Sequence, residues 1–239
     1  MAPRRPRKIN SSHLVDYGSP ANRDVNIDAA SKALRVSKTA VRKAMRQEVV
    51  SLRSVIYRGI TGRRDADVGE LTNVMGMLQA VYGYGPRGSK VNAKAAAEAL
   101  NVSAATVRRW ANGSQQPSPD HLKAIKTAAR QAASTKAGRR AATAIFRNSD
   151  RGRKALAGGA RTRIHISGYQ GPENYAWERD RDVSSDPVPA AEIEALLRAY
   201  EEGGDRGFLA YLTDIMNRWY LGEPWEFATI SEFWIGDWR

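Results

Sequence analysis

Two groups of basic and small polar side chains stand out in this 239-residue chain, one near residue 40 and one near residue 106. The first group is Lys38, Thr39, Arg42, Lys43 and Arg46, and the second is Ser103, Ala104, Thr106, Arg108, Arg109 and Asn112. Arg and Thr side chains can hydrogen-bond to base edges, and Lys and Arg pair with phosphate. Small residues at the start of such a helix let it enter the major groove. These residue types therefore favour contact with double-stranded DNA.

Motifs for catalysis are weak by comparison. The chain has no cysteine, and its three histidines lie far apart in sequence without a metal-binding spacing. Gly83, Gly85 and Gly88 match a dinucleotide fingerprint by letter, but Pro86 and a preceding helical pattern favour a loop. Asp65, Asp67 and Glu70 resemble a nuclease metal cluster, although capping of a helix start is the simpler interpretation. We expect no enzymatic activity, no catalytic residue, no cofactor and no metal.

An internal repeat connects the two basic groups. Residues 25–45 and 91–110 align without a gap at a constant offset of 66, and ten of twenty aligned positions are identical. Three of these identities are alanine, which weakens the count somewhat. A repeated structural unit remains the better explanation.

Each copy has the pattern of two short helices joined by a sharp turn. In the second copy, Ala96, Ala97 and Leu100 lie on one face of a short helix at 3.6-residue spacing. Asn101 stands at the turn, where Asn tolerates a left-handed backbone. Ser103 can cap the next helix, whose Val107 points inward. The outward side chains then face DNA. The alternative is an ordinary helical hairpin with solvated basic residues.

The run from Ala95 to Ile125 resembles a lambda-repressor-type helix-turn-helix domain. Such domains continue past the recognition helix with a W-x-N-G turn, a Pro-Ser step and a further amphipathic helix. The residues in those places here are Trp110, Asn112, Gly113, Pro117, Ser118 and Leu122. The family usually has Gly where this chain has Asn101. The resemblance implies a DNA-binding domain over about residues 67–135, with a preceding helix over Glu70–Val81.

The first copy departs further from that pattern, since Arg35 stands at the turn. Its outward residues remain strongly basic, which favours reading of bases or contact with phosphate. A decayed copy that only supports the fold is the alternative. The basic residues at positions 1–8, among them Arg4 and Arg5, suit an arm in the minor groove or a disordered tail.

Charge divides the chain into two parts. Residues 1–171 hold 32 Lys and Arg against 10 Asp and Glu, a net charge of +22, whereas residues 172–239 hold 6 against 15, a net charge of −9. The basic part predicts a polyanion-binding surface. The acidic, Trp-rich part would be repelled by phosphate, so we expect a separate module that serves assembly.

The C-terminal pattern differs from the helical repeat. Thr162–Ser167 and Trp225–Ile235 have strand character, and helices are expected over Pro189–Tyr200 and Gly207–Tyr220. A module this small buries little surface alone, so we expect a homodimer through it. The expected dimer residues are Trp219, Trp225, Phe227, Ile230, Phe233 and Trp234. A core made within one chain is the alternative.

The order of these elements is also similar to that of telomere-associated terminal proteins of actinobacterial linear replicons. In that family a side-chain hydroxyl becomes linked to the DNA 5′ end. The likeness runs weakly over residues 95–235 and includes the E-F-x-x-I-x-E-F pattern of Glu226–Phe233. No hydroxyl can be assigned as the acceptor. A transcriptional repressor or replicon-site binder of a plasmid, phage or mobile element is the broader prediction.

The expected fold is mainly α, with two tandem helix-turn-helix units followed by a small α+β module. The predicted boundaries are a flexible basic arm (1–22), a first unit (23–66), a second unit (67–135), a basic helix and linker (136–160) and an acidic assembly domain (161–239). No apolar run approaches the length of a membrane span. We expect a cytoplasmic, nucleoid-associated protein.

Overall fold

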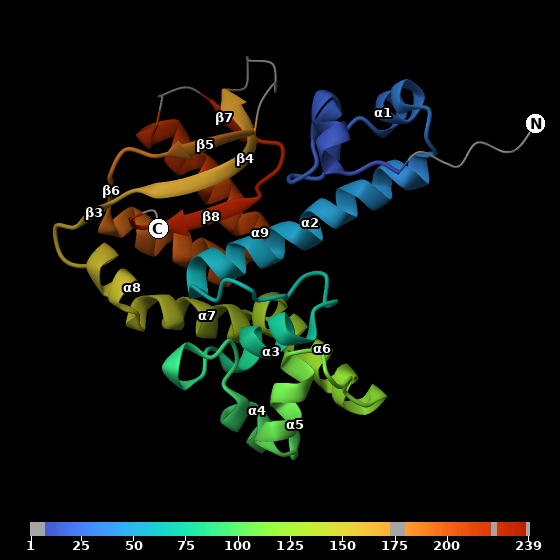
Figure 1. Cartoon of the computed structure of the whole chain (residues 1–239). Helices are drawn as coiled ribbons and strands as arrows, with labels where there is room; N and C mark the ends of the chain where they lie inside the picture. Colours follow the sequence, from blue (N-terminus) through green and yellow to red (C-terminus); the bar gives the residue numbers. More distant parts are fainter. Residues whose placement is uncertain (1–7, 173–179, 221–223, 238–239) are drawn as a thin grey trace, which may run out of the picture.

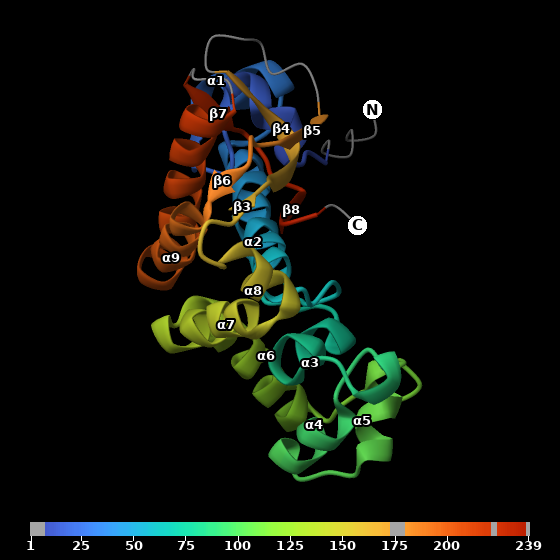
Figure 2. The same ribbon diagram turned by 90° about the vertical axis from the view of Figure 1, so that its left-hand side faces the viewer.

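A computed structural model describes residues 8–172, 180–220 and 224–237. The expected DNA contacts of Arg4 and Arg5 lie outside the described residues. Three hydrophobic clusters organise the rest. A sheet-containing body occupies the upper left of Figure 1, a small helical unit lies at its upper right, and a second helical unit lies below (Figures 1 and 2). The predicted fold class is confirmed.

The first unit, defined here as residues 11–46, is built around a small core. Its elements are the 3-10 helix η1 (Ser11–Tyr17), the paired strands β1 (Gly18–Ser19) and β2 (Asp24–Val25), α1 (Ile27–Leu34) and the start of α2 (Lys38–Thr61). Its fully buried residues include Leu14, Ala30 and Val41, each at 0% exposure. The flexible arm expected over 1–22 is therefore wrong for its second half, because η1 carries buried Leu14 and Val15 against this core.

Helix α2 leaves the first unit and enters the main core. Its 24 residues span about 36 Å, and its C-terminal half buries Leu52, Ile56 and Ile60 among residues of the C-terminal sheet. Gly59 lets strand β8 (Glu232–Ile235) approach, since a Cβ there would collide with Phe233. The first unit expected over 23–66 is consequently not an independent domain.

The second unit, residues 74–134, has its own core. Its elements are α3 (Val74–Tyr82), the 3-10 turn η2 (Pro86–Gly88), α4 (Ala93–Leu100), α5 (Ala104–Ala111) and α6 (Pro119–Ser134). Met77, Leu78, Ala96, Val107 and Ile125 are all buried in it.

Helix α3 begins later than the expected Glu70. The Asp67 carboxylate accepts hydrogen bonds of 2.8, 2.8 and 3.0 Å from the amides of Leu71, Thr72 and Asn73. These bonds hold a turn ahead of the helix, which Asn73 then caps. The capping interpretation is therefore wrong in detail, because Asp67 holds the turn before α3 and the first turn of the helix contains no acidic residue. In the parts of the chain that the structure describes, acidic and histidine side chains form no group that could hold a metal ion.

The C-terminal part is a sheet covered on one face by a long helix (Figure 2). Its elements are β3 (Arg161–Thr162) paired with β6 (Val188–Pro189), and β4 (Ile164–Pro172) paired antiparallel with β5 (Asp180–Ser184), β7 (Trp225–Phe227) and β8 (Glu232–Ile235). The strand expected over Trp225–Ile235 is two strands that both pair with β4. The two expected helices are joined as α9 (Ala190–Trp219), with a kink at Gly204, whose φ is 62°.

The prediction of a self-contained acidic module is wrong. Its core also takes in α2, α7 (Lys136–Asn148) and α8 (Asp150–Ala155), through residues such as Phe146 and Ala155. Four of the expected dimer residues are buried within this single-chain core, namely Trp225 (3% exposed), Phe227 (0%), Ile230 (2%) and Phe233 (4%). Trp219 and Trp234 are half-buried. The chain itself covers the apolar surface that dimerisation was expected to bury.

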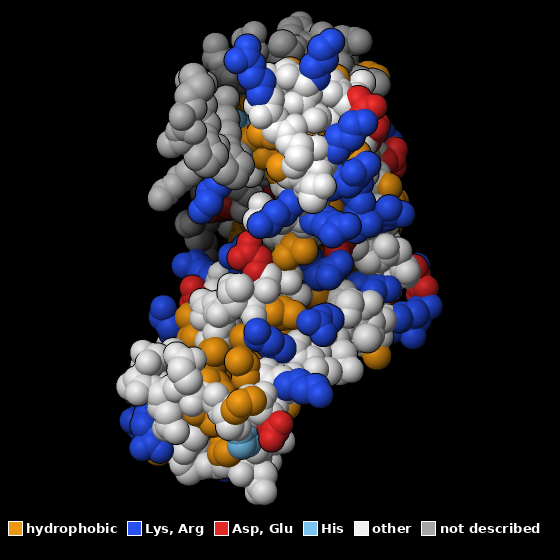
Figure 3. Space-filling view, turned by 90° about the vertical axis from the view of Figure 1, so that its right-hand side faces the viewer, with side chains coloured by type: hydrophobic (Ala, Val, Ile, Leu, Met, Phe, Trp, Pro, Cys, Tyr) orange, Lys and Arg blue, Asp and Glu red, His pale blue; other side chains and the backbone are white. Residues whose placement is uncertain are grey.

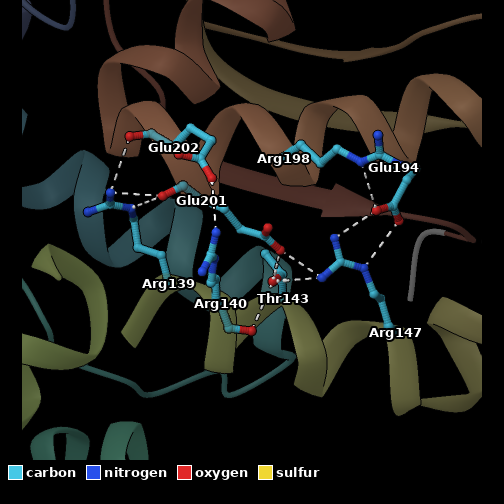
Figure 4. A network of polar contacts seen from close by, with 8 residues as sticks. All are labelled: Arg139, Arg140, Thr143, Arg147, Glu194, Arg198, Glu201 and Glu202. Carbon is cyan, nitrogen blue, oxygen red and sulfur yellow. Dashed lines mark hydrogen bonds and ion pairs between the residues drawn. The ribbon is translucent and has the colours of Figure 1, made fainter. Parts of the chain in front are cut away.

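Basic residues of α7 face acidic residues of α9 (Figure 4). Arg147 contacts Glu194 at 2.8 Å and Glu201 at 2.7 Å, and Arg139 donates to the Glu201 backbone carbonyl at 2.8 Å. Burial raises the pKa of Glu201, but hydrogen bonds from Thr143 and Arg147 outweigh it and leave that pKa below its ordinary value. The basic helix and linker expected over 136–160 consist largely of α7 and a second helix over Asp150–Ala155, and part of their charge is neutralised inside the chain.

Candidate nucleic-acid interface

The α4–α5 turn is set by short-range hydrogen bonds. The Asn92 side chain accepts from the Ala95 amide at 3.2 Å and starts α4. Asn101 ends α4 in the left-handed region, with φ 52° and ψ 49°. The Val102 amide then donates to the Ala97 carbonyl at 3.1 Å. These bonds satisfy the ends of the first helix and aim the chain into the second.

The inner face of α5 fixes its orientation. Val107 is 0% exposed and Trp110 is 4% exposed. The Trp110 ring lies 5.2 Å from the ring of His121 on α6, centroid to centroid. His121 in turn lies within hydrogen-bonding distance of the Leu100 carbonyl, 3.3 Å from its Nε2. Packing from α4 and α6 therefore leaves only one face of α5 free.

That free face carries the predicted residues. Arg108 and Arg109 are exposed, as are Ser103 and Asn112, while Ala104 and Thr106 are half-buried. Among the described residues, neither arginine has an acidic partner. Two cations without acidic partners beside small side chains suit a phosphate-lined groove.

Four of the predicted contact residues already have local partners. Ser103 caps α5 by accepting from the Thr106 amide at 3.1 Å, and the Thr106 hydroxyl accepts from Arg109 at 3.3 Å. The Asn112 side-chain oxygen accepts from the Ser114 amide at 3.0 Å and so holds the turn after α5. Of the polar side chains on this face, that of Arg108 is therefore the least engaged by other groups of the protein.

Sequence reasoning missed a loop that lies beside α5. Ser89, Lys90 and Val91 line one side of a cavity of about 440 Å³ whose other side includes Val107 and Arg108. Lys90 is exposed beside α5 and forms an ion pair of 3.8 Å with Asp65, which partly compensates its charge. No local pattern could reveal this, because the proximity arises from the packing of α3 against α5.

The first unit repeats this geometry around α1 and α2. Lys38, Thr39, Arg42, Lys43 and Arg46 are all exposed, as the sequence predicted. Lys38 pairs with Asp28 at 2.5 Å. The two basic groups are not brought together, since the two units lie at different ends of the molecule (Figure 1). On the side shown in Figure 3, Lys and Arg side chains recur from the first unit towards the second, with fewer acidic ones between.

Comparison with known families decides what the second unit is. Residues 89–127 match the family model described as helix-turn-helix, of the lambda-repressor-like type. The chain contains a DNA-binding helix-turn-helix domain. The matched segment covers α4, α5 and the first half of α6, so the resemblance drawn from Trp110 to Leu122 is confirmed. No curated protein and no solved structure matches the chain significantly. A membrane-crossing helix is not found in the described part of the chain.

Proposed function

We propose that this protein recognises a specific double-stranded DNA sequence through α5, and that it represses transcription or marks a replicon site. The observation that carries the proposal is the free face of α5, where Arg108 and Arg109 lie exposed in a DNA-binding domain. The proposal describes a binding protein and assigns no catalytic step.

The recognition helix would enter the major groove with its N-terminus first. Ala104 and the exposed Ala105 let the backbone approach base edges and can contact thymine methyl groups. Arg108, one turn further, can bind guanine O6 and N7 as a bidentate donor. In this pose, Arg109 and Asn112 would lie near the phosphate backbone of the DNA. Apart from half-buried Ala104, each of these roles uses a side chain that the packing of α4 and α6 leaves exposed.

Selection of bound fragments from the parent genome tests this function. We expect a small number of enriched fragments that share one sequence, and that sequence should lie near a promoter or a replicon end. Enrichment of fragments without a common sequence would contradict specific recognition. An origin on a plasmid, phage or other mobile element rests on the resemblance of the element order, and the location of the enriched fragments tests it as well.

A telomere terminal protein is the second candidate. The observation that favours it is the order of elements after the helix-turn-helix domain, namely basic α7, strand β4, the kinked α9 and strands β7 and β8, which both pair with β4. A denaturing gel of protein isolated from its host and treated with nuclease separates the two functions. A covalent nucleotide adduct supports the terminal protein, and a chain of unmodified mass supports the regulator.

A homodimer stays a prediction. It would need a surface other than Phe227 and Phe233, which are buried in the chain's own core. Half-buried Trp219 and Trp234 are the remaining members of the predicted set.

A further inference from the structure

The first unit matches the second in its backbone bonding. Asn26 accepts from the Ala29 amide at 3.0 Å, as Asn92 does from Ala95. Arg35 is left-handed, with φ 54° and ψ 46°, and the amide after it bonds the Ser31 carbonyl at 3.1 Å, the distance found for the equivalent bond in the second unit. The family match does not include this unit, since it starts at residue 89. Its geometry is nevertheless that of a helix-turn-helix.

The core of this copy does not use its outward face, on which Lys38 pairs with Asp28. The core of the first unit uses Leu14, Val25, Ala30, Val41 and Ala44. The exposed cations that remain are Arg42, Lys43 and Arg46, and in the described residues none of them has an acidic partner. Three such cations within five residues repel one another unless a polyanion binds them.

One rigid helix joins this face to the second unit. Arg42 and Arg46 lie near the start of α2, and Tyr57 lies near its end. The buried Tyr57 hydroxyl donates a 2.7 Å hydrogen bond to the carbonyl of Ala80 in α3. Helix α7 packs against both α2 and α6. The two recognition helices are therefore parts of one body and are not joined by a flexible linker.

We propose that residues 26–46 form a second DNA-reading unit, so that one chain recognises a bipartite duplex site with two non-identical half-sites at one fixed spacing. Arg42 and Arg108 occupy equivalent positions, so each half-site should contain a guanine. Ala104 and Ala105 correspond to Lys38 and Thr39, so the neighbouring bases differ between the half-sites. The inference rests on the proposed function, because it requires that the second unit reads DNA.

Nuclease protection of the selected genomic fragment by full-length protein tests this inference. The unaltered chain should protect two adjacent segments. The triple variant Arg42→Ala, Lys43→Ala, Arg46→Ala should lose one segment and keep the other, whereas Arg108→Ala should lose the segment that the triple variant keeps. Lys32→Ala, an exposed charge on α1 outside the recognition helix, is the matched control and should protect both.

Spacing gives a second readout that does not depend on folding of a variant. Inserting either 5 or 10 base pairs between the segments should weaken binding by about a hundredfold or more, since a rigid body cannot follow either displacement. Unchanged affinity with both insertions overturns the inference, as does unchanged protection by the triple variant while Arg108→Ala abolishes binding. The proposed function survives these two outcomes. If Arg108→Ala also leaves protection and affinity unchanged, the proposed function fails too.

Discussion

Arg35 and Asn101 lie 66 residues apart and adopt the same left-handed backbone, with φ angles of 54° and 52°. Each residue ends the first helix of a helix-turn-helix unit and is followed by a valine and a capping serine. The shared conformation makes the sequence repeat a structural one. It also places Arg42 and Arg108 at the same position of two recognition helices.

The turn predicts a stability difference between substitutions at Asn101. Asn101→Ala should lower the free energy of unfolding by about 1–2 kcal/mol, because a Cβ without a compensating polar group disfavours positive φ. Asn101→Gly should be nearly neutral, and Arg35→Gly should be neutral or mildly stabilising. Chemical denaturation monitored by circular dichroism measures all three. Equal losses for Ala and Gly at position 101 would show that the backbone conformation does not matter there.

The ion pairs between α7 and α9 predict acid sensitivity. Because the pKa of Glu201 is lower in the folded chain than its ordinary 4.5, the unfolded chain binds more protons around and below that pH. At neutral pH, ionised Glu201 should therefore make its full contribution to the free energy of unfolding. That contribution should be lost as the pH drops from about 5 towards 3. Arg147→Met should cost roughly 1–3 kcal/mol at neutral pH and flatten this decrease.

Arg198→Ala is the matched control for that experiment. Arg198 also pairs with Glu194, at 3.3 Å, but its side chain is 71% exposed. The loss there should stay below about 1 kcal/mol because solvent screens the pair. Thermal unfolding across the pH range gives both values. If the stability of the Arg147 variant falls equally steeply with acid, the contact between Arg147 and Glu201 is not the cause of the acid sensitivity.

Salt dependence reports how many phosphates the chain contacts. Six to ten contacts would cost roughly a thousandfold or more in affinity between about 50 and 200 mM salt, with a slope near −0.9 per contact. Replacing Arg42, Lys43 and Arg46 by Ala should reduce the slope magnitude by about 2–3. Fluorescence anisotropy at several salt concentrations measures this. If the slope stays unchanged, the basic face of the first unit is only solvated surface.

Removal of the C-terminal part should unfold the body of the protein. A chain of residues 1–171 loses α9, whose Leu196, Tyr200 and Leu212 are 0% exposed in the main core. We expect it to expose the apolar faces of α2 and α7 and to aggregate. Limited proteolysis should nevertheless release a stable piece containing α3–α6, which has a separate core. A fully folded 1–171 fragment would contradict the shared core.

Local sequence patterns were sufficient to predict the two turns. Asn101 and Ser103 act within a few residues of themselves, through a left-handed turn and a cap, so their roles are visible in sequence. The small buried residues Ala96 and Val107 follow helical spacing for the same reason.

Long-range packing could not be predicted in this way. Net charge gives no indication that Arg147 pairs with Glu194, 47 residues away, so the basic and acidic parts looked like separate modules. The same limit applies to Phe233 and Trp225, which looked like a dimer surface and instead fill the core beside α2 and α9. Tertiary contacts decide which apolar face of one element packs against which face of another.

The affinity of Arg108→Ala for the selected fragment tests the central claim most directly. Arg130→Ala, an exposed charge on α6 of the same unit, is the matched control. We predict that Arg108→Ala weakens binding to the selected fragment by about 5- to 150-fold and reduces its preference over random DNA, while Arg130→Ala changes the affinity far less. Equal affinities of the unaltered chain and Arg108→Ala for both DNAs would contradict recognition through α5.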